Sequence, residues 1–240
     1  MSRSSYFEPS RPTMQNVKTM PYFTPEFFQF FEQLSGNNNQ EWFEENKNVY
    51  EENVKRPFKD LVQLVIDRIS LFDKELRIPV NDAMFRIQKD TRFSRDKTPF
   101  NTHMGANISH GGKKSKECPG FFFRFSPDKI IVGGGTFELE KDNLTRVRHH
   151  IEDEMERFNS IVEDENFIQK YGILQGERNK VVPKDLRDLY EEQPYIANKQ
   201  FFYEAELDAN LLLDENLPDI LMEYYHAGKP LNDFLKEAIR

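Results

Sequence analysis

The stretch that decides the fold is Gly120-Phe121-Phe122-Phe123-Arg124-Phe125-Ser126-Pro127-Asp128-Lys129-Ile130-Ile131-Val132-Gly133. Two runs rich in aromatic and β-branched residues flank a Ser-Pro-Asp turn, which is the pattern of a β-hairpin. Gly133-Gly134-Gly135 closes the second strand, and we expect these glycines to provide a positive φ angle or close packing. A phosphate-cradling loop is the alternative, but the spacing and the lysine of a P-loop are absent.

Helical patterns precede the hairpin. Thr24-Pro25-Glu26 is a helix start and Gly36 supplies a stop. An Asn before a Glu-rich run is a capping signal, so a second helix is expected from Asn39. Pro57 breaks that helix or opens a third one.

Further elements lie on both sides of the hairpin. Short strands are expected at Met84–Ile87, Asn101–Ile108 and Gln200–Leu207. Helices are expected at Glu140–Phe158, Leu217–Gly228 and Pro230–Arg240. This order predicts one α+β domain over residues 21–240, with N-terminal helices, a central mostly antiparallel sheet and C-terminal helices. The polar residues 1–20 are interpreted as a flexible N-terminal arm.

The composition restricts the class of protein. The chain has 240 residues, a formal charge of -8 and no apolar run long enough to span a bilayer. The polar N-terminus lacks the apolar core of a secretory signal. The single cysteine, Cys118, excludes an intrachain disulfide framework and fits a reducing cytoplasm. A pI near 5.3 argues against general coating of nucleic acid.

The segment Arg86–Phe100 runs against this acidic background. Between Arg86 and Lys97 it holds five cations and two carboxylates, interleaved with hydroxyls. Such a loop suits a phosphate or carboxylate ligand. The candidate ligand-binding residues are Arg86, Arg92, Ser94, Lys97, Thr98, Asp90, Asp96, Trp42 and Asn39. The alternative is that Asp90 and Asp96 pair with these cations and lock the loop without any ligand.

Several blocks of the sequence resemble the uncharacterised family known as domain of unknown function 2461. The matching pieces are Asn38-Asn39, Glu41-Trp42-Phe43, Lys47, Arg86-Ile87, 90–94, 96–100, Gly120-Phe121-Phe122 and Gly133-Gly134-Gly135. Phe100 stands where the family pattern has Tyr, so the phenol hydroxyl is missing there. The resemblance implies one coherent domain with a special central loop. The family has no established activity, so the resemblance names no chemistry.

Other catalytic patterns are weak. The histidines at 103, 110, 149, 150 and 226 show no metal-ligand spacing, and no nucleophile elbow occurs. No cofactor can be assigned. We therefore predict a cytoplasmic protein that binds an anionic small molecule, with or without catalysis. The alternatives are a nucleic-acid-binding module that adds Lys113–Lys116 to the same loop, and a structural protein whose loop is an internal ion-pair network.

Overall fold

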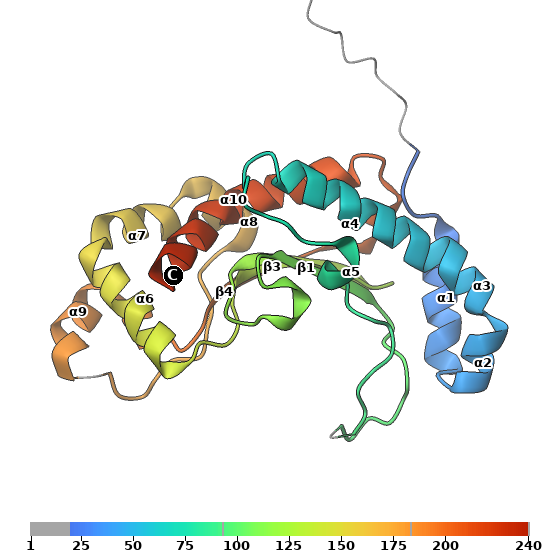
Figure 1. The fold of residues 1–240 in the computed structure, drawn as a ribbon, viewed down its shortest axis with the longest axis horizontal. Helices are drawn as coiled ribbons and strands as arrows, with labels where there is room; N and C mark the ends of the chain where they lie inside the picture. Colours follow the sequence, from blue (N-terminus) through green and yellow to red (C-terminus); the bar gives the residue numbers. More distant parts are fainter. Residues whose placement is uncertain (1–19, 93, 183, 240) are drawn as a thin grey trace, which may run out of the picture.

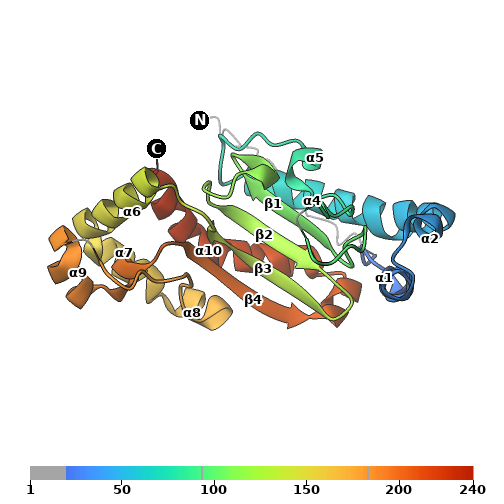
Figure 2. The same cartoon turned by 90° about the horizontal axis from the view of Figure 1, so that it is seen from below.

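The structure, a computed structural model, describes residues 20–92, 94–182 and 184–239. Its centre is a four-stranded antiparallel sheet, which is seen nearly edge-on in Figure 1. The strands lie side by side in chain order (Figure 2). The strands are β1 (Met104–Ser109), β2 (Gly120–Phe125), β3 (Lys129–Thr136) and β4 (Phe201–Asp208). The predicted N-terminal arm lies outside the described residues, except for residue 20.

Helices precede and follow the sheet, so the predicted α+β arrangement is confirmed. The α-helices before the sheet are α1 (Pro25–Gly36), α2 (Gln40–Glu45), α3 (Lys47–Tyr50), α4 (Arg56–Ile69) and α5 (Val80–Ala83), with the π-helical turn η1 (Glu51–Lys55) between α3 and α4. The later α-helices are α6 (Lys141–Asp153), α7 (Met155–Val162), α8 (Glu165–Tyr171), α9 (Arg187–Glu192) and α10 (Leu217–Ala238). Short 3-10 turns are η2 (Gly112–Lys114), η3 (Lys184–Leu186), η4 (Pro194–Ala197) and η5 (Ala209–Leu213).

The predicted hairpin is β2 and β3. Ser126 closes its turn, because its hydroxyl donates to Asp128 Oδ1 at 2.6 Å and its amide donates to the Lys129 carbonyl at 3.1 Å. The glycine triplet lies at the end of this strand as predicted, since β3 stops at Thr136, one residue after Gly135, and all three glycines pair with β4. Met84 forms only an isolated bridge to Ala106, so the expected strand at 84–87 is reduced to that bridge.

The hydrophobic core lies between one face of the sheet and the helices α4 and α10. Alternate residues of a strand point to the same face, and Phe121, Phe123 and Phe125 are almost completely buried there. The ring of Phe58 in α4 lies 5.4 Å from that of Phe125, and Tyr225 in α10 lies 5.7 Å from Phe121. Figure 2 shows the opposite face of the sheet in front of these two helices. Burying each Phe contributes about 1.5–3 kcal/mol.

The last helix differs from the prediction. Two helices separated near Gly228 are expected from the sequence, but α10 is continuous and contains Pro230. A proline inside a helix costs about 3 kcal/mol, and the packing of α10 on the sheet compensates for it. Tyr203 from β4 lies against Gly228 and donates its hydroxyl to the Gly228 carbonyl at 3.0 Å. The glycine therefore serves close packing and does not end the helix.

The glycines of β3 have the same purpose. A Cβ atom on Gly134 would lie 2.4 Å from the Tyr203 hydroxyl and 2.5 Å from the Gly120 carbonyl. The Gly135 amide donates to Asn232 Oδ1 at 2.9 Å, and Asn232 Nδ2 donates to the Gly120 carbonyl at 3.0 Å. The Gly135 amide thus binds a side chain of α10, which agrees with the expectation that these glycines allow close packing.

We predict that Gly134→Ala destabilises the fold by about 1–3 kcal/mol, because the new methyl group must displace Tyr203 or strand backbone. Gly36→Ala is the matched control, since a Cβ there meets nothing within 4 Å. Urea unfolding followed by circular dichroism measures both variants. Equal stability of Gly134→Ala and wild type would show that the close approach is not required.

A second junction ties the end of α4 to β1 and α10. The carboxylate of Asp73 lies 2.7 Å from His110 Nε2 and 3.1 Å from Lys236 Nζ. Burial alone would raise the pKa of this carboxyl, but the hydrogen bonds from His110 and Lys236 outweigh it and lower the pKa to about 2. The stabilisation is therefore present above the ordinary pKa near 3.8 and is lost as the pH falls through about 2.

We predict that Asp73→Asn lowers the free energy of unfolding at pH 7 by about 1 kcal/mol, a value that allows for solvent screening. The difference between variant and wild type should shrink as the pH is lowered towards 2. Urea titrations at pH 7 and pH 2.5 test this. A difference that does not change with pH contradicts the assignment.

Candidate functional site

The predicted basic loop projects from the sheet as a narrow, hydrogen-bonded excursion (Figure 1). The Lys89 amide donates to the Pro99 carbonyl at 2.8 Å, and the Asn101 amide donates to the Ile87 carbonyl at 2.8 Å. Asn38, which follows α1, holds the end of the loop like a strand partner. Its Nδ2 donates to the Phe100 carbonyl at 2.9 Å, and its Oδ1 accepts from the Phe100 amide at 3.0 Å.

The two carboxylates of the loop bind its own cations. Asp90 accepts two hydrogen bonds from the Arg92 guanidinium, at 2.9 and 2.6 Å, and these lower the pKa of Asp90 to about 2. Asp96 accepts from Lys89 Nζ at 2.7 Å, and this bond, with those from Thr98, holds the pKa of Asp96 well below its usual range. The geometry here is that of an internal ion-pair network.

The remaining loop residues support the same network. Lys97 donates to the Thr91 carbonyl at 2.9 Å, and the Ser94 hydroxyl accepts from the Asp96 amide at 3.1 Å. Thr98 accepts from Lys89 at 2.7 Å. The structure therefore brings Arg92, Ser94, Lys97, Thr98, Asp90 and Asp96 together in one loop, with their polar groups directed largely at one another.

Asn39 and Trp42 have structural contacts. Asn39 Oδ1 accepts from the Trp42 amide at 3.0 Å and so caps α2, as the sequence predicts. The indole of Trp42 packs 5.6 Å from the ring of Phe30 in α1. In the segment 38–42 it is Asn38 that forms hydrogen bonds to the basic loop, at the backbone of Phe100.

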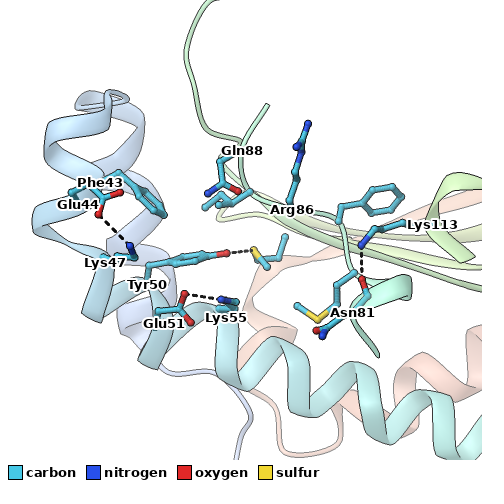
Figure 3. Close-up of a pocket in the computed structure, with 14 residues that line it drawn as sticks. Phe43, Glu44, Lys47, Tyr50, Glu51, Lys55, Asn81, Arg86, Gln88 and Lys113 are labelled. Carbon is cyan, nitrogen blue, oxygen red and sulfur yellow. Dashed lines mark hydrogen bonds and ion pairs between the residues drawn. The ribbon is translucent and has the colours of Figure 1, made fainter. Parts of the chain in front are cut away.

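Arg86 lies outside the loop network and lines a cleft of about 300 Å³ at the outer edge of β1 (Figure 3). We call it the edge cleft. Its helical wall is formed by residues 43–55 of α2, α3 and η1, and its facing wall by residues 81–88 with Met104 and Lys113. The floor is apolar and comes from the core, with Phe43, Tyr50 and Met104 all buried.

The charges of the two walls differ. On the helical wall, Lys47 pairs with Glu44 at 3.2 Å and Lys55 with Glu51 at 2.7 Å. The facing wall contributes no carboxylate side chain to the lining. Among the described residues, neither Arg86 nor Lys113 forms an ion pair with a carboxylate. The charge of Arg86 still acts on Asp90 and helps to lower the pKa of that carboxyl, and the Lys113 ammonium donates to the Asn81 carbonyl. The facing wall therefore carries positive charge that no ion pair within the cleft offsets.

Tyr50 supplies a neutral donor at the floor. Its hydroxyl faces Met104 Sδ at 3.9 Å, which is a weak acceptor. Burial raises the pKa of the Tyr50 phenol, so the hydroxyl stays protonated at neutral pH. The π-helical turn η1 follows directly; such turns are rare and are frequent at functional sites. Tyr50 and Lys55 were not predicted as site residues. The sequence held a signal for Lys55, because Lys47, Glu51 and Lys55 are spaced four residues apart and therefore share one helix face.

Within residues 20–92, 94–182 and 184–239, no three or more His, Cys, Asp or Glu side chains gather as metal ligands do. None of the helices in the same ranges has the length and apolar character needed to cross a membrane.

These observations define the class: an α+β protein with a meander sheet and a basic, apolar-floored cleft at the edge of β1. The chain belongs to the family described as conserved hypothetical protein (DUF2461), whose sequence model matches residues 26–234. Both walls of the edge cleft lie within the matched residues, and the resemblance inferred from the sequence is confirmed. The comparison with curated proteins gives no match.

We predict that Asn38→Ala destabilises the protein by about 1–3 kcal/mol, because it removes both side-chain hydrogen bonds to the Phe100 backbone. Hydrogen exchange of the Phe100 amide should become faster. Asn37→Ala is the control, since Asn37 is exposed and its side chain donates to the Gln33 carbonyl at the end of the same helix. Unchanged exchange at Phe100 would contradict the role given to Asn38.

Proposed function

We propose that this protein binds a small organic anion in the edge cleft, with a phosphate or carboxylate group on the facing wall and an apolar body on the floor. The observation that carries the proposal is the pair Arg86 and Lys113, two cations that form no ion pair with any carboxylate in the described part of the chain and that lie beside a buried apolar floor. Arg86 presents a planar fork that binds such groups through two hydrogen bonds, and Lys113 adds a compact charge.

The shape of the cleft agrees with a small ligand. A volume of about 300 Å³ is at the lower end of the range for small-molecule sites, which combine apolar walls with a few polar groups. The Tyr50 hydroxyl and the Gln88 amide can donate further hydrogen bonds. In this proposal, Arg92, Ser94, Lys97, Thr98, Asp90 and Asp96 keep the loop folded and so position Arg86.

A nucleic-acid-binding module is the second candidate, and it is favoured by the presence of Arg86 and Lys113 in one cleft. Lys116 does not extend this surface freely, because it pairs with Glu138. The formal charge of -8 also favours a compact site over an extended polyanion surface. The single free cysteine, Cys118, supports the proposal of a cytoplasmic location.

Phenyl phosphate, which joins a phosphate to an apolar ring, is a suitable probe for isothermal titration calorimetry. We expect binding of phenyl phosphate, no binding of uncharged phenol, and a loss of affinity of about tenfold or more in Arg86→Ala, since one charge-assisted contact contributes about 1.5–3 kcal/mol.

Arg95→Ala is the matched control, because Arg95 is an exposed arginine of the same loop that does not line the edge cleft. Equal weakening by both changes would point to diffuse charge and would contradict a cleft site. A lower melting temperature with unchanged affinity in Arg86→Ala would support the purely structural alternative. A single-stranded oligonucleotide that binds more tightly than phenyl phosphate, with a steep dependence on salt, would support the nucleic-acid candidate.

A further inference from the structure

A second cleft adjoins the edge cleft. It has a volume of about 220 Å³ and is lined by residues of the segment 77–82 and of the turn 110–114. We call it the neighbouring cleft. Lys113 lines both clefts, so they meet at this side chain, where η2 contacts α5. A molecule that spans both clefts must therefore pass the Lys113 side chain.

The ridge between the clefts has a fixed geometry. The Lys113 ammonium donates to the Asn81 carbonyl in α5. Gly112 has a φ of +64°, and a Cβ atom there would lie 3.1 Å from the Asp82 carbonyl oxygen. The Ser109 hydroxyl, which is buried, donates to the Gly112 carbonyl at 3.2 Å. These contacts hold Lys113 in place, so its charge is positioned before any ligand arrives.

The neighbouring cleft is also positively charged. Arg77 and Lys114 line it together with Lys113, and Asp82 is the one carboxylate among its lining residues. Among the described residues none of these three cations pairs with a carboxylate; Arg77 donates to the Leu76 carbonyl at 2.8 Å. The chain has 41 acidic and 33 basic residues, yet four cations, Arg86 included, that form no ion pair with a carboxylate of the described residues lie in these two adjoining clefts.

We propose that the ligand carries two anionic groups, as an organic diphosphate or bisphosphate does, and that it spans both clefts. This inference rests on the proposed function and names its substrate class. The first group lies with Arg86, the second with Lys114 and Arg77, and Lys113 lies between them. The apolar floor of the edge cleft takes the organic part.

The distribution of carboxylates limits the length of the ligand. Glu44 and Glu51 stand on the helical wall of the edge cleft, each paired with a lysine, and Asp73 pairs with Lys236 and with His110, which lines the neighbouring cleft. Beyond the cation group a longer polyanion would meet these ion pairs and no further group of cations without carboxylate partners among the lining residues. Two anionic groups fit the cations that lack carboxylate partners.

The test compares adenosine 5′-monophosphate with adenosine 5′-diphosphate and adenosine 3′,5′-bisphosphate by isothermal titration calorimetry. At least one of the two-group compounds should bind about tenfold more tightly than the monophosphate, as expected for one added charge-assisted contact. Lys114→Gln should abolish this gain and leave the affinity for the monophosphate unchanged. Lys116→Gln is the matched control, because Lys116 lies in the same connector, pairs with Glu138 and lines neither cleft.

The outcomes separate this inference from the proposed function. If phenyl phosphate binds and Arg86→Ala weakens it, but two-group compounds gain nothing over the monophosphate, the inference is wrong and the proposed function stands. If Lys114→Gln weakens all compounds equally, the effect is one of general charge and the inference is also wrong. If no anionic probe binds the wild-type protein, both fail. Tighter binding of a single-stranded oligonucleotide than of any two-group compound would overturn the small-ligand assignment.

Discussion

The close approach of α10 to the sheet is the contact on which the rest of the structure depends. Tyr203 is fully buried between β3 and α10, and its hydroxyl donates to the Gly228 carbonyl at 3.0 Å. Burial raises the pKa of this phenol, so it remains a neutral donor. Only glycines at 134 and 228 leave room for the ring. Asn232 then links the backbones of β2 and β3 to the same helix.

This arrangement also determines where a site can form. Because α10 packs chiefly on β3, β1 is left to contact η2, α5 and α4, and Met84 of the segment 84–88 bridges to its outer edge. Core side chains therefore reach the surface at this edge and form the floor of the edge cleft. The ring of Phe43 stacks on Phe100 at 4.0 Å, which joins the helical wall to the end of the basic loop. The basic loop and the helical wall of the cleft are thus in direct contact, although most of the loop's charges do not face the cleft.

Local features of this fold could be predicted from the sequence, because local interactions decide them. The Ser126-Pro127-Asp128 turn and the Asn39 cap depend on neighbours within a few residues. The continuity of α10 through Pro230 could not be predicted, since the helix packs on β3 and against Tyr203, which are distant in the sequence. The edge cleft could not be predicted for the same reason, because its residues come from four parts of the sequence: α2 to η1, 81–88, β1 and η2. Sequence proximity grouped Arg86 with Arg92 and Lys97, whereas the fold groups it with Lys113 and Tyr50.

The pairing of charges explains why the cations of the loop and those of the edge cleft differ in what they offer to an anionic ligand. In an acidic chain most cations can find a carboxylate, and the loop supplies its own in Asp90 and Asp96. Exposed ion pairs of this kind contribute little to stability, but they reduce the charge that a ligand would meet. Within the residues that the structure describes, Arg86 and Lys113 form no such ion pair, and they stand beside a buried apolar floor, where the field of a charge is less screened than in open water. An anion beside these two cations would gain more there than beside Lys89 or Arg92, because those two already pair with Asp96 and Asp90.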